Sequence, residues 1–504
     1  MYKVKSFFSI YLLIFLIALF SVPPDANAKE DAWDKIQRTK VFKWGTDAEG
    51  GAPFVFYNPE NPTQITGFEV DIINNISKKL GAKSVMIQND WDGLVPALKR
   101  ETFDMATNGI EITEARKQEV NFTRPYYIYT QQIVVQKNNT DIHKPEDLKG
   151  KKVGTLSASA AMNALLSLGL KVGDEIKIYP TVVGPYTDLE NGRIDAVVLD
   201  YIIAVYYAKN NKALKFVGEP FAKGYYGFCI RKEDKKLLAK ANDVILEMFK
   251  SGEIEALYKK WGIWTEEQRK LIDYHENQEM KGLQKKTTFE RLPKELPLLL
   301  KSAGVTIILC VISMTFAILL GLTIAVFRMY GPKPISYLLT AYVEIIRGTP
   351  LLIQLYIIYY GLPEISEHLM LEPFPAAIIG LSLNYAAYES EIYRAGIKSI
   401  HKGQMEAALA LGMTKVMALR KVIIPQAVRV VIPPVTNDFI AMFKDSSLVS
   451  VITMVELTKQ YNYLASTNYD YVGLGLTTAT IYFLMSYPAS VFAKKIEKKL
   501  ANER

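Results

Sequence analysis

The apolar residues of this chain are distributed unevenly along its 504 positions. Charged residues are frequent from about Lys29 to Lys301, whereas long apolar runs dominate most of the sequence that follows. A chain of this length exceeds the usual size of one hydrophobic core, so two or three domains are expected. The pattern predicts a soluble N-terminal part followed by a part that lies in a membrane.

The first residues have the organisation of a secretion signal. Two lysines precede an apolar run at Phe7–Phe20, and the small residues of Ala26-Asn27-Ala28 follow it. This order predicts a signal peptide over residues 1–28 that is cleaved after Ala28. An uncleaved membrane anchor is the alternative, and both interpretations place the chain from Lys29 onward outside the cytoplasm.

Hydropathy in the C-terminal part predicts five membrane-spanning helices. They run over Ala303–Phe327, Ile335–Leu362, Phe374–Tyr393, Gln426–Val451 and Val472–Ala493. Lysine and arginine concentrate in the connections 328–334 and 394–425 and in the tail, while the connection 363–373 carries three glutamates and no lysine or arginine. The positive-inside rule therefore places the soluble part outside, and the tail and residues 394–425 in the cytoplasm.

Several of the predicted spans contain polar residues, which are costly at membrane depth and must face protein or a wet pathway. They are Glu344, Arg347, Asn384, Glu389, Asn437, Asp438, Lys444 and Asp445. Glu344 and Arg347 are three positions apart, so they can instead neutralise each other. In the fourth span, Pro433-Pro434 predicts a broken helix of the kind that lines transport sites.

The most specific motif lies in the long cytoplasmic connection. It reads Glu406-Ala407-Ala408-Leu409-Ala410-Leu411-Gly412, then nine residues, then Val422-Ile423-Ile424-Pro425. Ala408 and Gly412 are four positions apart, so a helix would expose a small-residue face suited to a partner's groove. Gly412 would let the chain turn away, and a generic amphipathic loop is the alternative.

Residues 406–425 resemble the EAA motif of ATP-binding-cassette (ABC) importer permeases. Glu344–Leu351 and Lys444–Leu448 resemble further features of the polar amino acid branch of these permeases, the histidine, glutamate, glutamine, arginine and opine type. The resemblance covers about Arg291 to Lys499. It implies residence in a bacterial plasma membrane and a pair of permease domains, most simply a homodimer.

The sequence contains no Gly-x-x-x-x-Gly-Lys-Ser/Thr phosphate-binding loop. We therefore expect no ATP hydrolysis and no cofactor in this chain. The resemblance implies a separate ABC ATP-binding subunit that docks at Glu406–Gly412.

The soluble part alternates short apolar strands with helical patterns. Strands are predicted at Val41–Gly45 and Lys152–Thr155, and helices at Phe68–Leu80 and Ala160–Leu168. This alternation favours parallel α/β layers, and its second start at Lys151 predicts two lobes with a ligand cleft between them. We expect a binding domain at 29–264, a charged linker at 265–296 and a membrane domain at 297–504.

The soluble part also resembles the family 3 solute-binding proteins, which are periplasmic-type receptors for amino acids. Gly67-Phe68-Glu69-Val70-Asp71-Ile72 matches the family signature. Other motifs follow in family order: Gly45-Thr46-Asp47, Pro53-Phe54, Trp91–Leu98, Ile112–Arg116, Gly154-Thr155 and Gly192–Ala196. The resemblance implies an α/β bilobal domain like the type II periplasmic binding proteins, followed by an all-α membrane domain of five transmembrane helices.

An α-amino acid carries a carboxylate and an ammonium, and both need partners in a closed cleft. By the resemblance, Arg116 grips the carboxylate through a bidentate fork, aided by backbone N–H groups near Ser159, while Asp200 accepts the ammonium. Trp91 supplies a flat apolar wall. The predicted ligand-binding set is Asp47, Phe54, Trp91, Gly109, Glu111, Arg116, Ser159 and Asp200.

Each of three roles has a structural alternative. Arg116 can form a surface ion pair with Glu114 or Glu119, Asp200 can cap the following helix, and Trp91 can be core packing.

Two positions depart from the family pattern. Glu111 stands where serine or threonine is frequent, and Gly50-Gly51 replaces an aromatic residue. We expect the Glu111 carboxylate to share the ligand ammonium with Asp200, or to reach a cationic or amide side chain. These departures leave the amino acid open within the polar class.

Other classes of function fit less well. The net charge of +8 is modest and no basic stripe is apparent, so we expect no nucleic-acid binding. Only Cys229 and Cys310 are present, which predicts no metal cluster. A ligand-gated channel or sensor remains an alternative, but such channels interrupt the binding domain with their pore helices, whereas here that domain precedes the first predicted span, and a sensor would need a signalling domain after the last one. An enzyme that uses Glu111 as a base is a further alternative, and it leaves the cytoplasmic motif unexplained.

Overall fold

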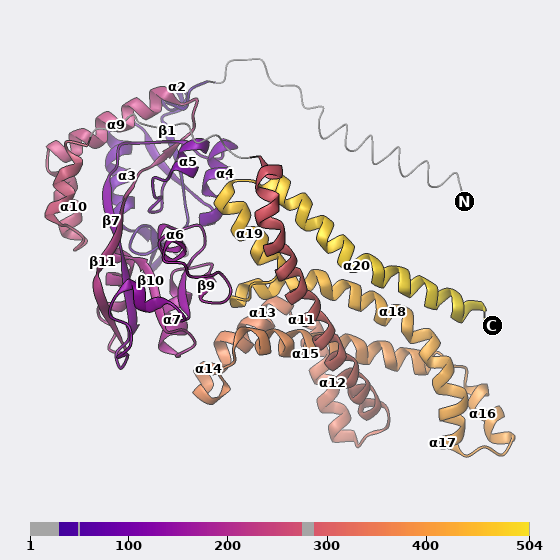
Figure 1. The fold of residues 1–504 in the computed structure, drawn as a ribbon. Coiled ribbons are helices and arrows are strands. Elements are labelled where there is room, and N and C mark those ends of the chain that lie inside the picture. Colours follow the sequence, from indigo (N-terminus) through magenta and orange to yellow (C-terminus); the bar gives the residue numbers. More distant parts are fainter. Residues whose placement is uncertain (1–29, 49–50, 275–286, 503–504) are drawn as a thin grey trace.

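The computed structural model describes residues 30–48, 51–274 and 287–502, and an α/β domain is followed by a helical domain (Figure 1). The predicted signal peptide, Gly50 and the middle of the predicted linker lie outside the described residues.

The α/β domain consists of two lobes, each built on a five-stranded sheet, as the strand and helix alternation predicted. The first sheet has the order β4 (Lys83–Gln88), β1 (Val41–Thr46), β5 (Met105–Ala106), β12 (Cys229–Ile230) and β6 (Asn121–Phe122). The second has the order β11 (Leu214–Tyr226), β7 (Tyr127–Gln136), β10 (Ala196–Asp200), β8 (Val153–Leu156) and β9 (Ile176–Tyr179). A hairpin, β2 (Phe56–Asn58) and β3 (Asn61–Thr66), extends the first lobe.

The helices of the α/β domain follow the same division. Those of the first lobe are α2 (Ala32–Thr39), α3 (Phe68–Lys79), α4 (Leu94–Lys99), α5 (Glu114–Glu119), α9 (Lys235–Lys250) and α10 (Glu253–Lys260). Those of the second lobe are α6 (Ala160–Ser167), α7 (Val183–Glu190) and α8 (Tyr201–Ala208). The predicted helices at Phe68 and Ala160 are confirmed to within one residue at each end.

The second lobe is an insertion into the first, which the sequence did not reveal. β12 returns to the first sheet and pairs antiparallel with β5 and β6. The chain therefore crosses between the lobes once before β7 and once after β11. These two strands pair with each other and form the hinge side of the cleft.

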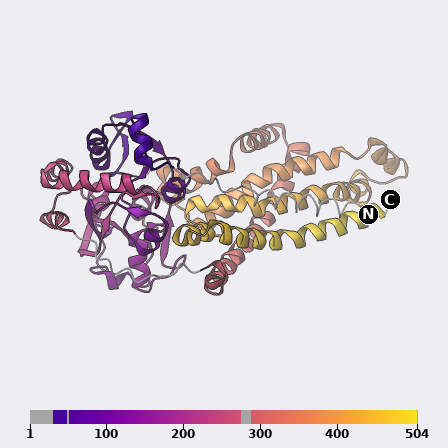
Figure 2. The ribbon, with the colours of Figure 1, turned by 90° about the horizontal axis from the view of Figure 1, so that it is seen from above.

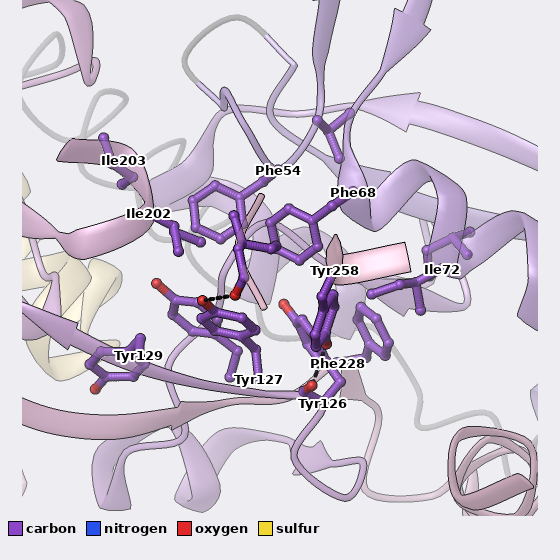
Figure 3. Close-up of a cluster of buried hydrophobic side chains, with 14 of the residues drawn as sticks. Phe54, Phe68, Ile72, Tyr126, Tyr127, Tyr129, Ile202, Ile203, Phe228 and Tyr258 are labelled. Carbon is purple, nitrogen blue, oxygen red and sulfur yellow. Dashed lines mark hydrogen bonds between the residues drawn. The ribbon is translucent and has the colours of Figure 1, made fainter. Parts of the chain in front are cut away.

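An aromatic cluster fills the junction of the lobes (Figure 3). Phe68 is fully buried, and its ring centroid lies 5.3 Å from that of Phe54 and 6.1 Å from those of Tyr127 and Tyr258. Such ring pairs add to the free energy gained by burying their large apolar surfaces. Because Phe54 also lines the cavity between the lobes, this cluster supports one wall of that cavity.

We expect Phe68→Ala to lower the free energy of unfolding of the binding domain by about 3–5 kcal/mol, because it leaves a large cavity in the core. The five tryptophans of the chain all lie between Trp33 and Trp264, so intrinsic fluorescence in denaturant reports this domain selectively. Tyr57→Ala, at a side chain exposed to solvent, is the control and should change stability by about 0.5 kcal/mol or less. Equal effects of the two substitutions would contradict the assignment of this core.

The helical domain contains ten α-helices among the described residues. They are α11 (Thr288–Tyr330), α12 (Lys333–Gly348), α13 (Leu351–Tyr356), α14 (Leu362–Ile365), α15 (Pro373–Lys398), α16 (Lys402–Ala410), α17 (Lys415–Ala418), α18 (Ile424–Asp445) and α19 (Leu457–Asn468), with α20 (Tyr471–Asn502) at the end. Short π-helical segments at Ile357–Gly361 and Leu419–Ile423 and a 3-10 helix at Ser446–Ile452 connect some of them. Figures 1 and 2 show the longest of these helices extending away from the α/β domain.

The second predicted span is bent rather than continuous. α12 and the segment Leu351–Ile365 meet at an angle of 110°. Pro350 cannot donate a backbone hydrogen bond, and the residue before a proline avoids helical geometry. The Gln354 side chain donates to the carbonyls of Ile346 and Thr349 at 2.8 and 3.1 Å, which satisfies acceptors that the break exposes.

The prediction that Pro433-Pro434 breaks the fourth span is wrong. α18 continues through both prolines and ends at Asp445, where the 3-10 helix begins. α18 packs against α15 and α20, and neighbouring helices can satisfy carbonyls that a proline leaves unpaired.

Of the described helices, only α11 is long and apolar enough by itself to cross a membrane, and the bent pair adds one more span if it is counted as a unit. The other predicted spans coincide with long helices that do not pass this test. α18, for example, carries four charged residues, namely Arg429, Asp438, Lys444 and Asp445. The finding establishes a helical domain with at least one apolar helix suited to a membrane.

The predicted linker is structured at both ends. Residues Glu266–Leu271 form a 3-10 helix on the binding domain, where Gln268 is buried and hydrogen-bonds both backbone groups of Ile128. At the other end α11 begins at Thr288 with a capping box formed by Thr287 and Glu290.

The start of α11 is also braced against the end of the domain. Arg291 and Thr288 both contact the Asp470 carboxylate, which caps the start of α20 through the backbone N–H of Gly473 at 2.9 Å. The brace fixes the short connection between α19 and α20.

The second lobe contacts the C-terminal part of the bent span through a buried polar cluster. The Arg193 guanidinium lies 4.1 Å from the ring centroid of Tyr359 and forms an ion pair with Asp188 at 2.7 Å. The Tyr359 hydroxyl donates to the same Asp188 carboxylate at 2.7 Å. The binding domain is thus fitted onto the helical domain by desolvated, hydrogen-bonded contacts.

Candidate functional site

The eight residues predicted to bind a ligand come together between the two lobes. A cavity of about 40 Å³ is lined by seven of them, Asp47, Phe54, Trp91, Gly109, Glu111, Ser159 and Asp200. Arg116 lies directly behind Glu111 and beside Trp91. The volume holds water molecules but not an amino acid, so a ligand enters only when side chains or lobes move. Ligand binding by these residues stays a prediction.

A buried carboxylate in α3 positions the loop that carries the site. Glu69 accepts hydrogen bonds from the backbone N–H of Gly109 at 2.8 Å and from the hydroxyls of Thr107 and Tyr126. Burial raises the pKa of Glu69 to about 7. Gly109 has a φ of 62°, and a side chain there would meet the Phe54 ring, so glycine is required at this close approach.

Asp47 and Trp91 form the outer wall. Asp47 accepts from the Trp91 backbone N–H at 3.1 Å and from Gln88 at 3.3 Å. The Trp91 indole N–H donates to the Asn108 carbonyl at 3.2 Å, and its ring centroid lies 5.0 Å from the Arg116 guanidinium carbon. Trp91 therefore lines the cleft as predicted and is not enclosed in the core.

Arg116 is buried, so it does not form the surface ion pair considered as an alternative. Its guanidinium donates to the Glu111 carboxylate, to the Glu111 carbonyl at 3.0 Å and to the Ala158 carbonyl of the second lobe at 3.0 Å. Its Nε donates to the Tyr469 hydroxyl of the helical domain at 3.1 Å. One cation thus contacts both lobes and the helical domain.

Glu111 is paired with protein groups that the sequence did not indicate. Its carboxylate binds Arg116 and accepts from the Ala160 backbone N–H at 2.8 Å, and its predicted contact with a ligand stays a prediction. Ala160 is the first residue of α6, where the partial positive charge of a helix start favours an anion. Its neighbour Ser159 caps this helix by accepting from Met162 N–H at 3.1 Å.

Asp200 stands at the end of β10 and before α8, but its side chain makes no capping hydrogen bond, so the alternative role is wrong. Its carboxylate accepts from Gln131 at 2.5 Å and from the Tyr226 hydroxyl, both on the hinge strands. Burial, and then the charge of Glu111, raise the pKa of Asp200 to about 7.

Sequence reasoning missed Gln131, Tyr226 and Tyr469. The first two are hinge residues with no local motif, and Tyr469 is separated from Arg116 by 353 positions. Only the positive φ of Tyr469, 53° at the end of α19, sets it apart locally. No group of three metal-ligating side chains occurs over residues 30–48, 51–274 and 287–502.

The EAA-like motif includes two short helices, α16 and α17, at the end of the helical domain far from the binding domain (Figure 1). Gly412 has a φ of 82° and follows the end of α16, which confirms the predicted turn. The predicted small-residue face is wrong, because Ala408 is buried and Gly412 lies beyond the helix. Glu406 and Ala407 are exposed, and Leu411 and Val416 are 81% and 76% exposed.

Two family models match this chain. Residues 42–263 match the bacterial extracellular solute-binding proteins, family 3, and residues 317–502 match the binding-protein-dependent transport system inner membrane component. The chain is 42% identical over 205 residues to the L-cystine transport system permease protein TcyB of Bacillus subtilis, covering 40% of this chain and 87% of that protein. It is 33% identical to the glutamine transport system permease protein GlnP of Escherichia coli, covering 41% of this chain and 94% of that protein.

Among solved structures, an ancestral arginine-binding protein bound to arginine is similar to this chain with a TM-score of 0.42 and 37% sequence identity. The match covers 44% of this chain and 98% of that protein.

The two domains define a transport protein of the inner membrane that carries its own solute-binding domain. The chain belongs to the binding-protein-dependent transport permeases, and it is a fused solute-binding and permease subunit of an amino acid ABC transporter.

We expect affinity for an amino acid to be highest above pH 7 and to fall as the pH drops through about 7, because Asp200 must be ionised to accept an ammonium. Calorimetry of the full chain at pH 8.0 and pH 5.5 measures this difference. Asp200→Asn should bind more weakly at pH 8.0 and lose most of the pH dependence. An unchanged pH profile in the variant would remove Asp200 from the ammonium site.

Proposed function

We propose that this subunit binds an amino acid in the cleft between its lobes and delivers it to its own permease domain. The observation that carries this proposal is the hydrogen bond from Arg116 to Tyr469, because it joins the predicted carboxylate site to the permease domain directly. Tyr471 adds a second contact by donating to the Asp92 carbonyl at 3.1 Å, next to Trp91. A ligand that rearranges Arg116 therefore changes a contact that the permease domain makes.

The proposed topology has five membrane spans, the binding domain outside and the C-terminus in the cytoplasm. Positive charge in alternate connections supports it. The positions of the binding domain and of α16–α17 at opposite ends of the helices are consistent with it (Figure 2). In this arrangement the bent span begins on the cytoplasmic side and reaches the binding domain at Tyr359.

The energy source is a separate ATP-binding subunit that docks at α16 and α17. Exposed Leu411 and Val416, together with Glu406, form the surface offered to it. Five spans from one chain do not enclose a symmetric pathway, so two permease domains assemble, most simply as a homodimer. This subunit itself performs no ATP hydrolysis.

The ligand belongs to the polar amino acids. The relatives named above transport L-cystine and glutamine, and a further relative, 32% identical and 94% covered, is the arginine transport system permease protein ArtQ of Bacillus subtilis.

The cleft assignment is tested by Arg116→Ala in the full chain, purified in lipid nanodiscs. We expect at least about thirtyfold weaker binding of the amino acid, because the buried carboxylate of the ligand loses its charged partner. Arg116→Lys, which keeps the charge without the fork, should lose less. Arg38→Ala removes an exposed arginine of the same domain and is the control. Unaltered affinity of Arg116→Ala by calorimetry would show that the ligand binds elsewhere.

The docking surface is tested by Leu411→Asp in proteoliposomes that also contain the ATP-binding subunit. We expect loss of ATP-dependent uptake, because a charge replaces an apolar contact, with ligand binding unchanged. Uptake that proceeds without ATP or the second subunit would favour the channel alternative instead.

A further inference from the structure

The carboxylate of Glu111 occupies the place toward which both predicted anion donors of the cleft point. One of its oxygens binds the Arg116 guanidinium, and the other accepts from the Ala160 backbone N–H at 2.8 Å. The first donor belongs to the first lobe and the second to the start of α6 in the second lobe. Glu111 thus satisfies the groups that would otherwise receive the carboxylate of an amino acid.

Glu111 cannot leave this place without a replacement partner. Its side chain is 3% exposed, and that of Arg116 is 5% exposed. A ligand carboxylate that takes over Arg116 and the α6 start leaves the Glu111 carboxylate buried and unpaired. An uncompensated buried charge is strongly unfavourable, so a ligand that supplies only a carboxylate gains little binding free energy.

The surroundings of Glu111 offer no second protein cation within the cavity. The ionisable residues among the described lining side chains are Asp47, Glu111 and Asp200, and all three are acidic. The ammonium of an amino acid can pair with Asp200. A displaced Glu111 then still lacks a cation, and only the side chain of the ligand can provide one.

We propose that Glu111 restricts the cleft to amino acids that carry a second cationic group. The ligand carboxylate replaces Glu111 on Arg116 and at the start of α6, the ligand ammonium pairs with Asp200, and the ligand side-chain cation pairs with the displaced Glu111. This inference rests on the proposed function of the cleft and adds the substrate class that the proposed function leaves open.

The test compares L-arginine with L-citrulline, its neutral analogue of nearly the same shape, by calorimetry on the full chain in nanodiscs. The wild type should bind L-arginine at least about thirtyfold more tightly than L-citrulline. In Glu111→Thr and Glu111→Gln, this ratio should fall by about tenfold or more, with L-citrulline binding more tightly than in the wild type. The two variants differ in size, so agreement between them excludes a packing effect, and fluorescence unfolding checks that both are folded.

Glu114→Gln is the matched control, since it removes a carboxylate three positions away that is 57% exposed and faces Lys117. It should keep the full preference for L-arginine. Agmatine, which has the guanidinium but no carboxylate, should bind much more weakly than L-arginine. Equal affinity for agmatine would show that Glu111 is not displaced and would overturn the inference.

Two further outcomes separate this inference from the proposed function. If the wild type binds L-citrulline as tightly as L-arginine, and Arg116→Ala abolishes both, the cleft assignment stands and the role of Glu111 is wrong. If neither the wild type nor the Glu111 variants bind any amino acid, the cleft assignment itself fails.

Discussion

The Arg116 guanidinium is the interaction on which the arrangement of this protein depends. Its hydrogen bonds reach Glu111 in the first lobe, Ala158 in the second lobe and Tyr469 in the permease domain. A buried guanidinium is always charged and needs all of its donors satisfied. A change at one of these partners therefore affects the hydrogen bonds to the others, as the proposed coupling between ligand binding and the permease domain requires.

Much of the architecture follows from local sequence. Strand and helix periodicity identified β1, α3, β8 and α6 to within one or two residues, because short apolar runs and capping residues act locally. The fold of the first lobe was not predictable in full, because β12 joins a sheet whose other strands lie more than 100 positions earlier. The sequence also does not show which prolines end a helix. Pro350 separates two helices where Gln354 can satisfy the freed carbonyls, whereas Pro433 and Pro434 remain inside α18.

In the candidate site, residues at motif positions were predictable, whereas contacts between distant parts of the chain were not. Arg116, Asp200 and Trp91 were identified because they occupy motif positions, and the structure brings them to one cleft. The partner of Glu111 was not predictable, since Ala160 N–H is 49 positions away and belongs to the other lobe. At the EAA-like motif, spacing alone suggested an exposed face at Ala408, but the way α16 packs buries that residue and exposes Leu411 instead.

The brace at Asp470 has a consequence for how such a fused chain is built. Arg291 and Thr288 hold this carboxylate from the first turn of α11, and Tyr469 is its immediate neighbour. α11 has 43 residues and is about 65 Å long, roughly twice the thickness of a hydrocarbon layer, so it is longer than one membrane span requires. The linker from the binding domain leads into the first turn of α11, and this turn also holds the segment whose tyrosine contacts Arg116. A force applied through the linker and a rearrangement of Arg116 therefore act on the same contact between α11, α19 and α20.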